Sequence, residues 1–412
     1  MPRGNDMHLL LTIAWRNIWR HPARSGVLIA AVAVGLWAAV MVIGWANGLM
    51  QQRMDYVIER ELTHLQIHHP DFPDDGHPWD HIPDHNQITS WLDDHPQVRS
   101  HASRTITDGM LQSPVKTSGV RIRGIDVAAE TRTTTFHENM VQGEFLDADL
   151  SNPAIISRIL ADEHNMRIGN RIVLTFENVD RELTSSAFHI AGLFTSASSE
   201  YDKRNIFVRS KDLTEILAGR PIFHEIGVML VHEIETEAFV AMLNKHFEDI
   251  LAQTWRELSP ELSMIVELGD VMILLISLII MAALGFGILN TMLMALFERM
   301  RELGMLLSIG MSKVRIFCMI MLEALILTFS GALIGMALAW LSLHHLGQTG
   351  INLEMFAQGA ALIGFDYLIY PFLSIGDFLL MSLVVVSVTL AASLYPALKA
   401  VRIHPLEAAR DA

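Results

Sequence analysis

The stretch "ALFERMRELGMLLSIG", residues 295–310, decides how the rest of this chain is read. It begins as the end of a long apolar run and then places four charged residues within five positions. Those residues are Glu298, Arg299, Arg301 and Glu302. A second apolar run opens soon afterwards, so the pattern indicates a short polar connection between two membrane spans.

Charge-free runs predict where the membrane spans lie. The chain has 412 residues, of which 51% are hydrophobic. A helix needs roughly 20 apolar residues to cross a bilayer, and four charge-free runs are long enough. We therefore predict a membrane α-helical protein with four transmembrane helices and an α+β extracytoplasmic domain inserted after the first. The predicted segments are an interfacial helix at 1–24, spans at 25–50, 271–297, 316–345 and 377–398, the extracytoplasmic domain at 51–270, a cytoplasmic connection at 298–315, an extracytoplasmic loop at 346–376 and a tail at 399–412.

Basic residues predict the orientation, because they concentrate on the cytoplasmic side. They lie before the first span, between the second and third, and after the fourth, whereas 346–376 contain none. Both termini are therefore expected in the cytoplasm, with the chain crossing the membrane several times. Residues 51–265 hold 19 Lys+Arg and 34 Asp+Glu, a net charge of −15, and the remainder is neutral. An acidic external domain argues against nucleic acid as a partner.

The first residues predict contact with membrane lipids. Trp15 and Trp19 share one side of a helix, with Arg16 and Arg20 nearby. Tryptophan at headgroup depth beside arginine is typical of an interfacial helix. The alternative is that these arginines only flank the first span.

Short β-branched runs predict the strands of the inserted domain. Helices are predicted at 157–166 and 235–254, and two helical stalks are expected at about 51–62 and 258–269, each continuous with a span. The predicted strands are 65–69, 120–126, 154–157, 171–176, 187–194, 205–210 and 226–232.

Sequence motifs for catalysis are missing. No lysine follows a glycine, so there is no nucleotide-binding P-loop, and neither a G-x-S-x-G nor an H-E-x-x-H motif occurs. The single cysteine, Cys318, excludes a disulfide within the chain and a paired-cysteine zinc site. We expect no catalytic residue and no cofactor in this chain.

Eight histidines lie between His64 and His101, interleaved with aspartates. His81 and His85 are four apart, a spacing that suits a metal on a helix. Four prolines between residues 70 and 83 forbid a regular helix there, so that spacing loses its geometric meaning. We predict an exposed connector without a metal site; a histidine-rich metal sensor is the alternative.

Inside the third span, Glu323 is costly in hydrocarbon and needs a partner or water. Pairing with Arg315, bonding to neighbouring helix groups and a place near the headgroups stay open, and we expect a structural role rather than ion conduction. Small residues in the spans allow close helix packing or dimerisation. They are Gly285, Gly287, Gly331 and Gly335.

Three segments resemble the MacB/FtsX superfamily of ABC-transporter permeases. In "ERMRELGMLLSIGMSKVRIFCMIMLEALIL", residues 298–310 match the family pattern E-R-x-R-E-[IL]-G-x-[LM]-x-[AS]-[IL]-G, and 322–324 match part of its third span. The ending "SLYPALKAVRIHPLEAARDA" and the opening "IAWRNIWRHPARS" resemble the family's two ends. The lipoprotein-releasing (Lol-type) branch is most similar, through "THLQIHHP", "VQGEFL" and "AIISRILADEHNMRIGNRIVLTF".

The resemblance implies a four-span permease subunit with a Porter-plus-Sabre external domain. Such subunits form homodimers or heterodimers and work with a separate cytoplasmic ATPase pair, which binds the ATP and Mg²⁺. The implied function is mechanotransmission from the ATPase to the periplasmic domain, for extraction or export of a lipoprotein or another hydrophobic substrate. The stretch that opened this section would be the ATPase-coupling site, made of Glu298, Arg299, Arg301, Glu302, Leu303, Gly304, Ser308, Gly310 and Lys313.

Two departures keep the function open. Residues 1–24 are expected to leave no room for the ATPase domain that precedes the permease in MacB. The segment at 174–192, which matches the chaperone-recruiting hairpin of one Lol-type subunit, is short and lacks proline. Recruitment of a periplasmic partner by this chain therefore stays open. The alternatives are an FtsX-like regulator of cell-wall hydrolases and MacB-like efflux of peptides or drugs.

Overall fold

The structure is a computed structural model that describes residues 12, 15–16, 20, 22–146, 150–196, 198–352 and 368–402. The chain divides into two compact units. The helical unit comprises Met1–Met50, Glu267–Leu353 and Leu368–Ala412, and the sheet unit comprises Gln51–Val266 and Glu354–Tyr367. The boundary between them falls within two long helices, α2 and α11.

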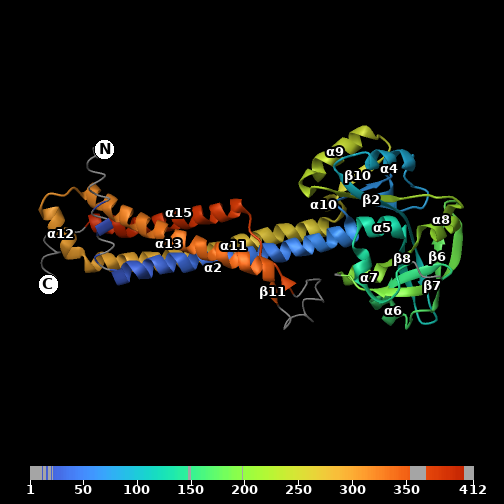
Figure 1. The fold of residues 1–412 in the computed structure, drawn as a ribbon, viewed down its shortest axis with the longest axis horizontal. Helices are drawn as coiled ribbons and strands as arrows, with labels where there is room; N and C mark the ends of the chain where they lie inside the picture. The colour runs from blue at the N-terminus through green and yellow to red at the C-terminus, as the bar shows by residue number, and fades with distance from the viewer. Residues whose placement is uncertain are drawn as a thin grey trace. The chain divides into compact units, whose positions relative to one another are not determined.

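Four helices of the described chain are long and apolar enough to cross a membrane, as the sequence predicted. The third is the most buried and the second the least. At one end of the helical unit α12 joins the second helix to the third, and at the opposite end β11 and β12 pair as a two-stranded antiparallel sheet (Figure 1). The elements are α2 Pro22–Val57, α11 Pro260–Glu298, α12 Met300–Ser308, α13 Lys313–Thr349, β11 Ile351–Asn352, β12 Leu368–Ile369 and α15 Ile375–Val401.

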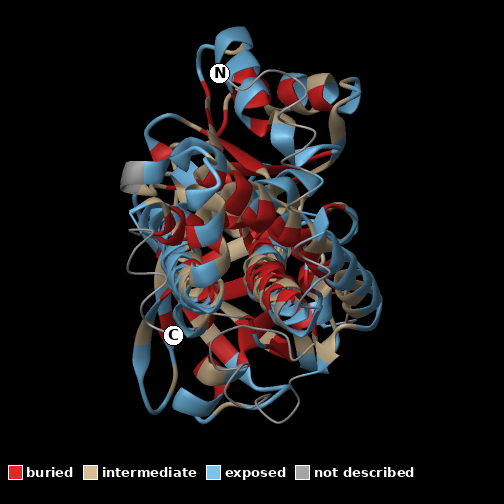
Figure 2. Cartoon of the chain, turned by 90° about the vertical axis from the view of Figure 1, so that its left-hand side faces the viewer, coloured by how far each residue is buried: buried red, intermediate tan, exposed pale blue. Residues whose placement is uncertain are grey.

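One apolar cluster, with residues from all four long helices, holds the helical unit together. Buried residues gather where the helices face one another, and exposed residues lie on their outward sides (Figure 2). Gly331 and Gly335 let α13 approach α2, because an added Cβ would lie 2.8 Å from the Ile29 carbonyl oxygen and 2.7 Å from that of Ala33. At these positions a larger side chain would push the two backbones apart.

The sheet unit is built on a ten-stranded sheet of order β10-β1-β9-β2-β3-β8-β5-β7-β4, with β6 pairing β2 and β7. The long strand β2 organises it: its first half pairs with β9, and its second half pairs with β3 and then also with β6. The strands are β1 Leu65–His68, β2 Val98–Gln112, β3 Thr117–Ile125, β4 Met140–Gly143, β5 Pro153–Ser157, β6 Arg171–Glu177, β7 Leu183–Phe194, β8 Asn205–Arg209, β9 Glu225–Leu230 and β10 Leu251–Thr254.

Two main cores form on this sheet. One lies under α4 and α9 and includes Ile67, Leu92, Val228 and Phe239. The other buries residues of β2, β3 and β5 to β8 together with α6 and α8. In Figure 1, α4 and α9 lie beside β10, whereas α6 and α7 lie at the other end of the unit. The helices are α3 Phe72–Asp75, α4 His85–Asp93, α5 Val127–Thr133, α6 Arg158–Glu163, α7 Ser199–Arg204, α8 Ser210–Ala218, α9 Thr236–His246 and α10 Trp255–Leu258.

All seven predicted strands are present, but the predicted helix at 235–254 is wrong in its second half. The helix α9 ends at His246, and Leu251–Thr254 form β10, which pairs antiparallel with β1. The histidine-rich connector is also less exposed than predicted, since His68, Phe72 and Ile82 are buried in it.

The two predicted stalks pack against each other inside the sheet unit. Met54 and Ile58 share a buried cluster with Leu262 and Trp255. The first stalk ends in a π-helix, Ile58–Leu62, followed by Thr63 at φ 65°. A positive φ is uncommon outside glycine and marks a sharp, locally strained change of direction. The second stalk is shorter than predicted, because Ser259 separates α10 from α11.

Candidate functional site

The predicted coupling stretch forms a helical corner between α11 and α13. The first helix ends at Glu298, and Arg299 leaves the helical conformation at φ −105° and ψ 13° before α12 begins. After α12, Gly310 adopts φ +100°, a region that glycine enters at little cost. The amide nitrogen of Met311 then bonds the Leu306 carbonyl at 3.0 Å, which closes the corner.

One side of α12 is buried and the other exposed. Leu303 and Gly304 face the helical unit. Arg301, Met305 and Ile309 are exposed, with Ile309 84% accessible. Large exposed apolar side chains beside a cation are unusual on a solvated helix and are typical of a docking surface.

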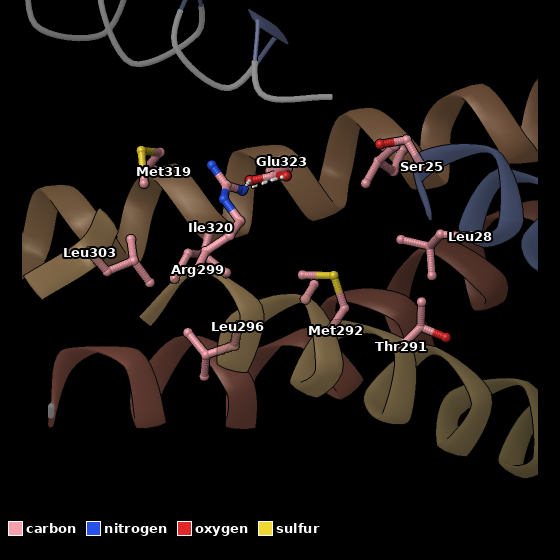
Figure 3. Close-up of a pocket in the computed structure, with 12 residues that line it drawn as sticks. Ser25, Leu28, Thr291, Met292, Leu296, Arg299, Leu303, Met319, Ile320 and Glu323 are labelled. Atoms are coloured by element: carbon pink, nitrogen blue, oxygen red, sulfur yellow. Dashed lines mark hydrogen bonds and ion pairs between the residues drawn. The ribbon is translucent and has the colours of Figure 1, made fainter. Parts of the chain in front are cut away.

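Arg299 turns inward from the corner and pairs with Glu323 of α13. Its Nη1 atom lies 3.0 Å from each of the two carboxylate oxygens of Glu323 (Figure 3). The Arg299 side chain is 12% exposed and that of Glu323 is 7% exposed. A buried pair of this kind satisfies the intramembrane carboxylate and fixes the corner against the third helix.

A second carboxylate extends this pair toward the surface. Oε2 of Glu302 lies 3.5 Å from Nε of Arg299, and Oε1 of Glu302 lies 3.5 Å from Nη1 of Arg20. The chain of alternating charges therefore links the N-terminal segment, α12 and α13. A shift of α12 has to change at least one of these contacts.

A small cavity of about 40 Å³ lies beside the ion pair. Figure 3 shows it between α11, α13 and the start of α2, with polar groups from Ser25, Thr291, Arg299 and Glu323 among apolar side chains. The volume suits a few water molecules at most.

The structure divides the predicted coupling residues into two groups. Arg299, Leu303 and Gly304 lie inward, and Glu302 is half-buried. Sequence reasoning gave all nine the same role. The helix breaks at Arg299, so helical spacing in the sequence does not separate the inward arginine from the outward residues of the cluster. The outward group is Glu298, Arg301, Ser308, Gly310 and Lys313.

Other predicted residues are more scattered. Trp15 and Arg16 are helical and exposed, as is Arg20, while Trp19 lies outside the described residues. An added Cβ at Gly285 would lie 3.2 Å from Val388 of α15. Beside Gly287 nothing lies within 4 Å in the described part of the chain.

The histidine segment does not bring His81 and His85 to one point. Nε2 of His81 lies 3.3 Å from Nη2 of Arg220, whereas Nε2 of His85 lies 2.7 Å from Oγ of Ser103. Among the described residues, one group has the arrangement of possible metal ligands, with atoms all within 4.8 Å of one another. It consists of His69, Asp71 and Asp80.

Sequence reasoning missed a buried ionic network at the centre of the sheet. The Arg104 guanidinium bonds Glu130 through two nitrogens, at 2.6 and 2.9 Å, and also bonds Glu225. All three side chains are at most 5% exposed. Burial raises the pKa of the Glu225 carboxyl, but the nearby charges of Arg123 and Arg104 outweigh it and lower that pKa to about 2. The network ties β2 to β9 and α5.

Two family models match most of the chain. The MacB-like periplasmic core domain matches residues 25–245, and the FtsX-like permease C-terminal matches residues 274–405. The chain therefore belongs to the FtsX-like permeases with a MacB-like periplasmic core domain. It is an ABC-transporter permease of the class found in bacterial inner membranes.

Two distant curated relatives match most of the chain. The lipoprotein-releasing system transmembrane protein LolC of Neisseria meningitidis serogroup B is 21% identical over 93% of each chain. The macrolide export ATP-binding/permease protein MacB of Nitrosomonas europaea is 21% identical over 82% of this chain, which spans 52% of that relative's length.

Solved structures of extracytoplasmic regions also align with part of the chain. The periplasmic region of MacB from Actinobacillus actinomycetemcomitans is 15% identical, with a TM-score of 0.34, and the match covers 53% of this chain and 98% of that one. The extracellular domain of the transporter YknZ from Gram-positive bacteria is 11% identical, with a TM-score of 0.32 and coverages of 46% and 99%.

Proposed function

We propose that this chain is the permease subunit that couples ATP hydrolysis by a separate ATPase to extraction or export of a lipoprotein or another hydrophobic substrate. Motion of the ATPase is passed to the sheet unit through the two stalks. The likeness to LolC over 93% of both chains favours lipoprotein as the substrate class.

The observation that carries the proposal is the corner at α12. Its outer side exposes Arg301, Met305 and Ile309. Its inner side is fixed to α13 by Arg299 and Glu323. A partner that docks on the outer side therefore displaces a helix that is tied to the spans. Polar contacts around an apolar centre set the register of such docking.

The proposal also includes the orientation of the chain in the membrane and the assignment of ATP binding to the partner ATPase. Both termini and α12 lie in the cytoplasm, on the side of the ATPase, because basic residues flank the spans there. The sheet unit lies in the periplasm. ATP and Mg²⁺ bind the partner ATPase, and this chain supplies no catalytic residue. The exposed apolar surfaces of α11 and α15 contact lipid and a second permease subunit, identical or different.

Charge reversal on α12 tests the docking role. Arg301→Glu places a carboxylate on the outer side without touching the pair of Arg299 and Glu323. We expect the variant to lose the ATPase on co-purification, or to lose stimulation of ATP hydrolysis. The matched control is Arg167→Glu, an exposed arginine of the sheet unit. If Arg301→Glu assembles and stimulates hydrolysis as the wild type does, this corner is not the coupling site.

Two other functions use the same fold: regulation of cell-wall hydrolases and efflux of peptides or drugs. Purification of the chain with its ATPase, followed by mass spectrometry of what accompanies it, separates them. Lipoproteins support the proposal. A hydrolase or a membrane-fusion protein in their place would replace it with the corresponding alternative.

A further inference from the structure

One group of side chains in the connector between β1 and α4 has the donors of a metal site. It consists of His69, Asp71 and Asp80, and one imidazole nitrogen and one oxygen of each carboxylate all lie within 4.8 Å of one another. His69 and Asp80 are half-buried and Asp71 is exposed, so the group is open to solvent and to an incoming ion. Neither the corner at α12 nor the stalks contain these residues.

The spacing within the group suits one small ion. Nδ1 of His69 lies 3.7 Å from Oδ2 of Asp71. Two ligands of a tetrahedral zinc ion, with bonds of about 2.1 Å, lie roughly 3.4 Å apart. These two side chains are therefore already near the spacing of ligands, and the Asp80 carboxylate is close enough to join them by a side-chain adjustment.

The imidazole presents an unprotonated nitrogen to the group. Nδ1 of His69 accepts a long hydrogen bond, of 3.3 Å, from the amide of Asp71. A nitrogen that accepts a hydrogen bond carries no proton, and this is the form of the ring that binds a metal. A coordinated ion would take the place of that hydrogen bond, because both use the same lone pair.

The charges of the group also favour a cation. Asp71 and Asp80 bring two carboxylates within 4.8 Å of each other, and like charges at this distance repel. Among the described residues, no lysine or arginine pairs with either carboxylate, and the contact of His69 with Asp71 is an ion pair only when the imidazole is protonated. A divalent cation between the carboxylates would replace repulsion by attraction.

Buried contacts hold both sides of the connector in place. On one side His68 is 4% exposed, and its Nδ1 atom lies 3.0 Å from the carbonyl oxygen of His224. On the other side Nε2 of His224 donates to the Pro78 carbonyl at 2.9 Å, and the amide of Ile82 donates to the Phe223 carbonyl at 2.8 Å. The same two residues of the sheet unit therefore anchor both sides, and an ion would not have to order the connector.

We propose that His69, Asp71 and Asp80 bind one divalent transition-metal ion such as zinc, with water completing the coordination. An imidazole nitrogen among the ligands favours zinc over magnesium and calcium, which prefer oxygen ligands alone. No metal was expected in this connector, because its prolines exclude a regular helix. This group needs no helix, since its ligands meet across a loop. The inference is independent of the proposed function, because binding requires neither ATP nor the ATPase.

Calorimetric titration of the full chain with zinc chloride tests the site. The chain is purified in a neutral maltoside detergent without a histidine tag, and a chelator first removes any bound metal. We expect one-to-one binding in the micromolar range or tighter, and much weaker binding of calcium. His69→Ala and Asp80→Asn should each weaken zinc binding at least about tenfold, since even residues that only support a ligand change metal affinity by about 10- to 100-fold.

Matched variants locate the ion. His81→Ala and Asp84→Asn remove an imidazole and a carboxylate of the same connector that lie outside the group, and both should bind zinc as the wild type does. Asp71→Asn changes a side chain that is 72% exposed, so it tests the site even if another variant fails to fold; it too should weaken zinc binding at least about tenfold.

Three results would overturn the proposal. The first is the absence of micromolar zinc binding by the wild type. The second is zinc binding that His69→Ala, Asp71→Asn and Asp80→Asn leave unchanged, which would place the ion elsewhere. The third is calcium binding as tight as that of zinc, which would exclude the imidazole as a ligand.

Discussion

The pair of Arg299 and Glu323 should be the largest single polar contribution to the stability of the helical unit. Nη1 of Arg299 lies 3.0 Å from both carboxylate oxygens, and both side chains are at most 12% exposed. Removing one member of a buried ion pair costs about 3 to 5 kcal/mol, because the other charge stays buried. We therefore expect Arg299→Gln and Glu323→Gln each to destabilise the unit by about 3 kcal/mol.

A double-mutant cycle measures the interaction itself. Unfolding of the full chain by sodium dodecyl sulfate in mixed micelles, followed by fluorescence, gives the free-energy change of each variant. The double variant should be less destabilised than the sum of the single variants by about 2 kcal/mol. Arg301→Gln, exposed and two residues away, is the control and should change stability by less than about 0.5 kcal/mol. An interaction energy near zero would refute the claim that this pair fixes the corner.

Three further outcomes follow from the packing and the charges. Gly335→Val should destabilise the helical unit by about 2 kcal/mol or more, since its Cβ would meet the Ala33 carbonyl oxygen. Gly287→Ala is the control, because nothing lies within 4 Å of that position in the described residues. Equal unfolding free energies for the two variants would contradict the close approach of α13 to α2. The pKa of Glu225 is lowered from 4.5 in the unfolded chain to about 2 in the folded chain, so the unfolded chain binds more protons between these two pH values. This carboxylate therefore adds about 3 kcal/mol to the free energy of unfolding at pH 7, and that contribution is lost as the pH falls from 4.5 to about 2. Glu225→Gln should flatten that part of the pH dependence of unfolding, and an unchanged slope would show that the pairing with Arg104 is not stabilising. Calorimetry of the full chain with zinc should show no stoichiometric micromolar binding that depends on His81 and His85, because their ring nitrogens have separate partners. A one-to-one isotherm that is abolished by His81→Ala and His85→Ala would contradict this prediction.

The membrane spans and the inserted domain were predictable because their signals are local. A charge-free run long enough to cross a bilayer can be recognised without knowing which helices it packs against. The short β-branched strands were predictable for the same reason. The coupling corner was visible as a charge cluster, and only its resemblance to a family gave it a role.

The long strand β2 was not predicted, although it organises the sheet. Its pattern from Val98 to Gln112 mixes buried polar residues such as Arg104 and Thr107 with exposed ones, so it lacks a clear apolar alternation. Strand β10 was read as helix because its conformation comes from pairing with β1, far away in sequence. Such pairing depends on tertiary context more than on local propensity.

The candidate site was predictable in place and not in detail. Within one charged cluster, the sequence did not separate the inward Arg299 from the outward Arg301. The helix breaks at Arg299, and this break reorients the residues around it. The sequence does not predict the break, because no proline or glycine lies at that position. The partner of Glu323 was sought near its own helix, whereas the structure places Arg299, 24 residues earlier, beside it.

The central claim is that motion of the stalks relative to each other drives substrate release, and cross-linking the stalks tests it most directly. Met54 and Leu262 share one buried cluster, and Cys318 is the chain's single cysteine. In a Cys318→Ser background, Met54→Cys and Leu262→Cys are combined, and each single variant is the control. Lipoprotein release from proteoliposomes with the ATPase and ATP is then measured before and after oxidation. We predict that oxidation stops release while ATP still binds, and that reduction restores it. Release at the normal rate from efficiently cross-linked complexes would contradict the claim.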